Sequence, residues 1–391
     1  MRRPDRGLAV LALLSLCGCA LPPERINPPP PELVGVADIP GIPHARQWGD
    51  APPEEIESWL QLPEDVLRER YGGVMRREHD YLVISGGGGN GAFGAGLLAG
   101  WSEHGSRPEF QIVSGTSTGA LIAPFAFLGP SHDATLKEMY TRYSTEDLVE
   151  YRSVIGIFRW DAALSTERLR DLIARYVSDE VIEAIAAEGK RGRSLFVGTT
   201  NLDAGRPVVW DITRIAASPS PGARDLIHDI ILASTSIPGA FPPVIVAVEA
   251  GGVRYDEMHV DGGVTSQLFL ASTGIDWRDV HEKLAVEGDP NLYVIRNSRI
   301  RPEPEAVQRR LIPVLGRTVS TLINAQGIGD IAKLYAMSAE YGFNFQVAYI
   351  PDSFEGEAQE TFDRQYMGRL FEFGYELARA GEAWTLVRIV E

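Results

Sequence analysis

Short apolar runs alternate with helix-like stretches along the chain from residue 81 onward. YLVIS (81–85) and FQIVSG (110–115) predict two buried strands, and the stretches at 91–105 and 118–129 predict the helices that follow them. Further strand-like runs lie at 194–200, 207–212, 244–248, 291–297 and 344–350. Further helix-like stretches lie near 165–188, 222–234, 304–326 and 359–380. This alternation predicts an α/β fold with a mainly parallel central sheet and helices on both faces.

The segment before this pattern is rich in proline, with ten prolines between residues 20 and 53. Proline fixes φ and lacks a backbone N–H, so such a segment is a poor candidate for helix or sheet. We expect an extended tether over residues 19–53. Short amphipathic helices over 54–73 then open a folded domain at 54–391, whose core motifs span 81–270.

The first 18 residues have the composition of a targeting signal. Arg2, Arg3 and Arg6 form a basic region, and an apolar run of ten residues follows at 7–16. This run is too short to cross a bilayer as a stable helix. The sequence therefore predicts a signal peptide over residues 1–18.

The stretch LCGC at the end of this run is similar to a bacterial lipobox, in which a small residue precedes the lipidated cysteine. Gly18 precedes Cys19, whereas the bulky Leu16 precedes Cys17, so Cys19 is the expected acceptor. A plain secretion signal is the alternative interpretation. Because Ala20 follows Cys19, we expect a lipid anchor in the outer membrane of the bacterial envelope, facing the periplasm. The chain has no other cysteine; because Cys17 would be removed with the signal and Cys19 would be acylated, no disulfide is expected in the mature fold.

Charge excludes one class of partner. The 391 residues carry a formal net charge of −16, and no basic stripe appears along them. Nonspecific nucleic-acid binding needs clustered lysines and arginines to meet the phosphates. We therefore expect no nucleic-acid partner.

The stretch SGTSTG (114–119) places Ser117 between a predicted strand and a predicted helix. It fits G-x-S-x-G, with Gly115 and Gly119 on either side of the serine. Such a turn can hold a serine in a strained elbow with its hydroxyl exposed, and the following helix N-terminus favours developing negative charge. Ser117 is a candidate nucleophile, and the alternative is a small residue in a tight turn.

A second glycine-rich turn, GGGGNG (86–91), follows the first strand. Its backbone N–H groups could point at an oxyanion. Gly86, Gly88 and Gly91 also satisfy the dinucleotide fingerprint G-x-G-x-x-G, but no ribose-binding acid follows about 20 residues later. A phosphate-binding P-loop is excluded because no Gly-Lys-Ser/Thr follows. We therefore expect no nucleotide cofactor, and no motif for a metal is present.

The candidate base is an aspartate in HVDGGV (259–264). Asp261 stands at a predicted strand end before Gly262 and Gly263, where its side chain can project toward the elbow. An ordinary turn aspartate is the alternative. His259, two residues earlier, is interpreted as a packed or solvent-facing histidine. The histidines that follow Ser117 offer no convincing triad partner: His132, His228, His259 and His281.

The order GGGGNG, GTSTG, DGG resembles that of the patatin family of lipid acyl hydrolases. TNLDAGRPVVWD (200–211) and ASTSIPGAFPPV (233–244) are similar to further family segments. The resemblance is strong from about 81 to 270 and weaker to about 350. It implies a three-layer sandwich without a metal or organic cofactor, acting on a lipid or acyl ester.

The resemblance also implies the roles of individual residues. Ser117 would be the nucleophile and Asp261 its base, a dyad without histidine. The oxyanion hole would be drawn from the loop Gly86, Gly87, Gly88, Gly89, Asn90 and Gly91. The family usually has Arg or Lys at the position of Asn90. The resemblance therefore supports ester hydrolysis more firmly than it supports a phospholipid as the substrate. A lipoprotein that binds lipid or a partner without catalysis is the alternative function.

Overall fold

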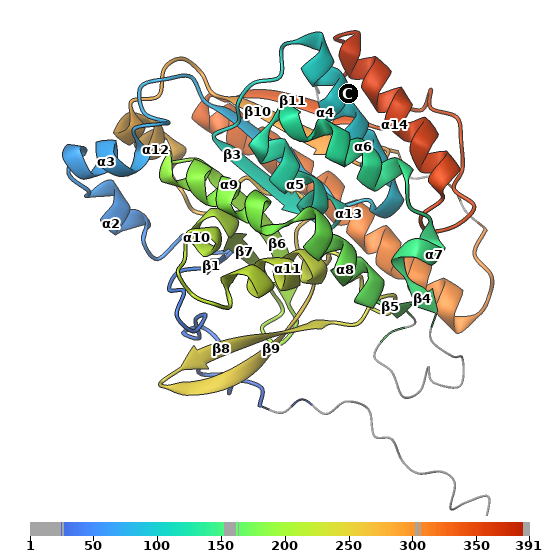
Figure 1. Cartoon of the computed structure of the whole chain (residues 1–391), viewed down its shortest axis with the longest axis horizontal. Coiled ribbons are helices and arrows are strands. Elements are labelled where there is room, and N and C mark those ends of the chain that lie inside the picture. The colour runs from blue at the N-terminus through green and yellow to red at the C-terminus, as the bar shows by residue number, and fades with distance from the viewer. Residues whose placement is uncertain are drawn as a thin grey trace, which may run out of the picture.

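The computed structural model describes residues 25, 27–151, 162, 164–301, 304 and 306–385 (Figure 1). The predicted signal and Cys19 lie outside these residues. Five parallel strands form the centre of the sheet in the order β6-β3-β2-β10-β11. Their bounds are β2 Asp80–Ile84, β3 Ile112–Thr116, β6 Ser194–Asn201, β10 Asn291–Arg296 and β11 Asn344–Tyr349.

Antiparallel strands extend this sheet beyond β6. Strand β7 (Arg206–Asp211) pairs with β6, and β1 (Arg46–Trp48) pairs with β7 at the edge. Strand β9 (Val253–Asp261) pairs with the end of β6 and forms a hairpin with β8 (Val244–Ala250). The sheet is thus mixed, with a parallel centre, as the sequence predicts. A separate small ladder joins β4 (Glu150–Tyr151) to β5 (Leu164–Ser165).

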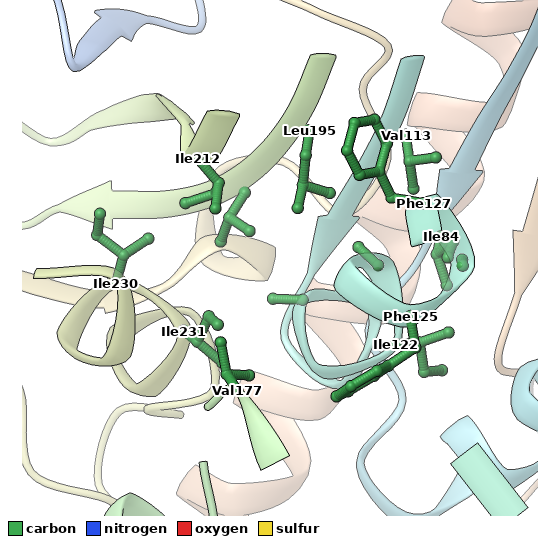
Figure 2. Close-up of a cluster of buried hydrophobic side chains, with 14 of the residues drawn as sticks. Ile84, Val113, Ile122, Phe125, Phe127, Val177, Leu195, Ile212, Ile230 and Ile231 are labelled. Atoms are coloured by element: carbon green, nitrogen blue, oxygen red, sulfur yellow. The ribbon is translucent and has the colours of Figure 1, made fainter. Parts of the chain in front are cut away.

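Helices cover both faces of the sheet. Side chains alternate along each strand, so each face presents its own apolar residues to the helices that cover it. Leu82 and Ile84 of β2 belong to a core packed against α4, α5 and α14, part of which Figure 2 shows. Tyr81 and Val83 point the other way, into a cluster with residues of α12 and α13. The result is a three-layer arrangement.

Most of the long helices lie at the predicted stretches, whereas α6 and α12 lie outside all of them. The helices that flank the sheet are α4 Gly91–His104, α5 Thr118–Leu128, α6 Asp133–Thr141, α8 Glu167–Tyr176, α9 Asp179–Lys190, α11 Ala223–Ser234, α12 Trp277–Leu284 and α14 Arg364–Arg379. Shorter ones are α2 Ile56–Leu60, α3 Glu64–Tyr71, α7 Thr145–Leu148 and α10 Ile212–Ala216, with 3-10 turns at Gly88–Asn90 (η1), Pro130–His132 (η2) and Gly262–Val264 (η4). The helix expected near 304–326 instead spans Leu311–Tyr341 (α13).

The expected tether over residues 19–53 is wrong for its C-terminal part. Ala37, Ile39 and Ala45 are buried in the main core, and Trp48 pairs with Val208 of β7. The stretch 44–48 contains no proline, so its backbone N–H groups can join the sheet edge. This short strand lies between prolines on either side, which is why the proline content of the segment does not reveal it.

Candidate active site

Ser117 occupies a strained turn between β3 and α5. Its backbone has φ 55° and ψ −125°, a conformation that non-glycine residues rarely adopt. Only glycine fits at the two flanking positions, because a Cβ there would clash with neighbouring backbone atoms. A Cβ on Gly115 would lie 2.3 Å from the Gly119 carbonyl oxygen, and a Cβ on Gly119 would lie 2.2 Å from that of Ile84. The sequence of the elbow thus permits a turn that any larger flanking residue would prevent.

Ser234, which the sequence reasoning did not single out, holds this elbow from α11. The Ser117 backbone N–H donates to Ser234 Oγ (2.9 Å), and the Ser234 hydroxyl donates to the Gly198 carbonyl of β6 (2.6 Å). Ser234 is fully buried. The only sequence signal was its place in the segment 233–244, which resembles the patatin family.

Asp261 ends β9 and meets Ser117 inside the protein. Its carboxylate accepts a hydrogen bond from the Gly263 backbone N–H (2.7 Å), and the nearby Ser117 hydroxyl also favours the ionised form. Asp261 is 2% exposed, and burial raises its pKa to about 7 against the opposing effect of Ser117 and Gly263. A Cβ on Gly262 would lie 2.5 Å from the Gly198 carbonyl oxygen, so the glycine allows β9 to approach β6.

The glycine loop lies directly beside the elbow. A Cβ on Gly86 would be 2.9 Å from the Ser117 Cβ, and one on Gly91 would be 2.3 Å from Thr118 Oγ1. Gly87 is exposed at the loop tip, followed by Gly88 at φ 55°. Loop and serine are therefore close enough to act on one bound group.

Asn297, another residue that the sequence motifs do not indicate, forms hydrogen bonds at both ends of this loop. Its side-chain amide donates to the Ser85 carbonyl (2.9 Å), and its Oδ1 accepts from the Gly94 backbone N–H (3.0 Å). Asn90 accepts from the Tyr366 hydroxyl of α14 (2.9 Å). The loop is thus held by residues about 200 or more positions away in the sequence.

Each histidine that follows Ser117 has its partner elsewhere. His132 packs against Phe125, His228 bonds to the Val177 carbonyl (2.8 Å), and His281 bonds to the Tyr81 hydroxyl (3.1 Å). His259 lies fully buried on β9 beside Thr199 Oγ1 (3.0 Å). None of these contacts joins a histidine to Ser117.

His259 belongs to a buried charge network that reaches the N-terminal segment. Its Nε2 lies 3.3 Å from Glu257, and Arg46 of β1 donates to the same carboxylate, in one contact at 3.0 Å. Burial raises the pKa of Glu257, but hydrogen bonds from His259 and Arg46 outweigh it and lower the pKa to about 2. Burial lowers the pKa of His259. Glu257, His259 and Asp261 share one face of β9.

A cavity of about 410 Å³ lies apart from this site. It is lined by the N-terminal segment, α12 and the sheet, including Trp48, Trp59, Tyr81 and Trp277. Neither Ser117 nor Asp261 lines it. Among the described residues, no group of three or more His, Cys, Asp or Glu side chains is placed to hold a metal ion.

Comparison with known proteins matches part of this chain to one family. Residues 82–272 match the family model described as Patatin-like phospholipase. This part of the chain therefore forms a patatin-like domain, and the α/β fold with a mixed, mostly parallel sheet is the patatin fold. A comparison with curated proteins finds no match. Among solved structures, the chain is similar to VipD from Legionella pneumophila, with 13% identity, 78% of this chain and 67% of that chain covered, and a TM-score of 0.32.

Proposed function

We propose that this protein is a serine hydrolase that cleaves acyl esters of lipids through a Ser117–Asp261 dyad. The observation that carries the proposal is the strained turn that sets the Ser117 hydroxyl beside the buried Asp261 carboxylate, whose pKa is raised to about 7. A carboxylate with its ordinary pKa of about 4 is a weak base, and one near 7 is well matched to accept a proton at neutral pH. The patatin-like domain supports lipid esters as the substrate class.

The reaction follows from these positions. Asp261 accepts the hydroxyl proton while Ser117 Oγ attacks the acyl carbonyl carbon, and loop amides of residues 86–91 stabilise the oxyanion. The ester C–O bond breaks, and the leaving alcohol takes the proton from Asp261. Water, activated by the same carboxylate, then hydrolyses the acyl-serine and releases the fatty acid.

A panel of lipids tests this function. The purified protein should release fatty acid from at least one neutral ester or phospholipid, whereas Ser117→Ala should not. If wild-type protein binds lipid vesicles but releases no fatty acid from any of them, the non-catalytic alternative is correct.

The dyad predicts a specific pH dependence. Because only the ionised Asp261 accepts a proton, kcat/KM should fall about tenfold per pH unit below an apparent pKa of about 7. The raised pKa also means that the folded state binds the proton more tightly, so it contributes a fall in unfolding free energy from about pH 4 to 7. Asp261→Asn should remove this contribution in denaturation curves. A kcat/KM profile flat between pH 5 and 8 contradicts the assignment.

Asn90→Arg tests what the departure from the family means. If a positive charge beside the loop holds an anionic headgroup, this change should raise turnover of an anionic phospholipid relative to a neutral ester of the same chain length. Asn90→Gln is the neutral control. Equal effects of Asn90→Arg on both substrates would show that a charge at this position does not bind the headgroup.

We further propose that Cys19 is acylated and anchors the protein in the bacterial outer membrane. The lipobox-like LCGC after the apolar run supports this proposal. Metabolic labelling with a palmitate analogue should mark the wild-type protein and not Cys19→Ser. Label retained by Cys19→Ser would show that the lipobox interpretation is wrong.

A further inference from the structure

The N-terminal half of α13 exposes an apolar face to solvent. Positions three, four and seven apart share one side of a helix. On this side lie Val314, Leu315, Thr318, Thr321, Leu322, Ala325 and Ile328, and all seven are exposed. Leu315 is 54% and Leu322 is 65% exposed. The opposite side packs on the body through the buried residues Gly327, Asp330, Ile331, Leu334 and Ser338.

The two threonines on the exposed face have hydroxyl groups that already donate hydrogen bonds within the helix. The Thr318 hydroxyl donates to the Val314 carbonyl (2.8 Å), and the Thr321 hydroxyl donates to the Arg317 carbonyl (2.7 Å). These hydroxyls are already satisfied within the helix, so burying the face would leave neither donor unpaired. The stripe itself contains no charged residue.

Basic residues gather at the start of this helix. Residues 299–329 hold five arginines and two glutamates, although the whole chain has a net charge of −16. Arg301, Arg309 and Arg310 are exposed. An apolar helical face next to arginines is complementary to an anionic bilayer, whose headgroups attract the cations while its acyl region accepts the apolar side chains.

Helix α13 is connected to the candidate active site. It packs against η4, the turn that follows Asp261. Asp330 accepts hydrogen bonds from the backbone N–H groups of Gln267 (2.7 Å) and Leu268 (3.2 Å). A Cβ on Gly327 would lie 2.8 Å from Gln267 Oε1, so the helix and this loop are in close contact.

We propose that the exposed face of α13 (residues 314–328) docks on the surface of an anionic lipid bilayer. No helix among the described residues is long and apolar enough to cross a membrane, so α13 would lie in the interface. Docking would bring the edge of the sheet that carries Asp261 toward bilayer lipids. That consequence rests on the proposed lipid hydrolysis, whereas the docking itself does not.

A fluorescent label at position 322 tests the docking. The full chain with Cys17→Ser and Cys19→Ser contains no cysteine, so Leu322→Cys gives one attachment site for an environment-sensitive dye. Glu183→Cys on the exposed side of α9 is the matched control. Both are made in the Ser117→Ala background, so that no product alters the membrane. On vesicles of phosphatidylglycerol and phosphatidylethanolamine, the dye at 322 should shift to the blue and the dye at 183 should not.

Charge reversal tests the arginines. Arg309→Glu with Arg310→Glu should raise the lipid concentration for half-maximal shift by at least about tenfold, and phosphatidylcholine vesicles should give a weaker shift than anionic ones. The docking is overturned by no shift at 322, by equal shifts at 322 and 183, or by a shift that grows with protein concentration without vesicles, which would indicate a second copy of the chain. Docking that fails while soluble esters are still hydrolysed would leave the proposed function intact.

Discussion

Ser117→Ala and Asp261→Asn should each lower kcat/KM by on the order of 10³ or more, which corresponds to about 4 kcal/mol of transition-state stabilisation. The serine supplies the attacking oxygen and the aspartate accepts its proton, so neither step has a substitute. Both changes are close to isosteric, and Ser117→Ala should leave the thermal unfolding midpoint within a few degrees of wild type. Steady-state kinetics on a soluble ester measure the effect.

Two further variants separate the dyad from other mechanisms. The double variant should be little worse than either single one, because nucleophile and base act as a unit and their losses do not add. His281→Gln should stay within about tenfold of wild type, since His281 bonds to Tyr81 and not to the serine. A loss in His281→Gln as large as that in Ser117→Ala would require a histidine in the mechanism.

Arg46→Ala should lower the free energy of unfolding by about 3–5 kcal/mol, because it leaves the buried carboxylate of Glu257 without its cation. Glu257 is fully buried, and the Arg46 side chain is 6% exposed. Arg46 also donates to the Ala37 carbonyl (2.7 Å), so the N-terminal segment should loosen as well. Chemical denaturation at pH 7 measures the change.

Neutralising both partners provides the control. Arg46→Met with Glu257→Gln should recover part of the loss, since no unpaired charge is then buried. A double variant whose loss equals the sum of the two single losses would show that the two residues do not interact. An Arg46→Ala protein as stable as wild type would show that the ion pair between Arg46 and Glu257 does not stabilise the fold.

The sequence predicts the local features of this protein well. The turns near residues 86 and 117 are formed by glycine-containing segments at the ends of strands, so a few neighbouring residues are enough to predict each turn. The same holds for the turn after Asp261. Such signals also indicate that two glycine-rich turns lie together, because β2 and β3 are consecutive parallel strands.

The supports of the site could not be predicted in this way. Ser234 reaches the elbow across 117 positions, and Asn297 reaches the glycine loop across more than 200. Serine and asparagine are common residues, and apart from the family-like segment that contains Ser234, no local pattern marks these contacts. The proline content of residues 19–53 does not reveal β1, because this strand needs only three residues without proline. The features that the sequence does not predict are therefore contacts between residues far apart in the chain.

Reaction with a long-chain fluorophosphonate tests the identity of the nucleophile most directly. This reagent phosphonylates activated serines with loss of fluoride and is not readily hydrolysed from them. Mass spectrometry of the digested protein should find the adduct on Ser117, with labelling slowed strongly in Asp261→Asn. No adduct, or an adduct on a different serine while Ser117 stays unmodified, would contradict the proposed dyad.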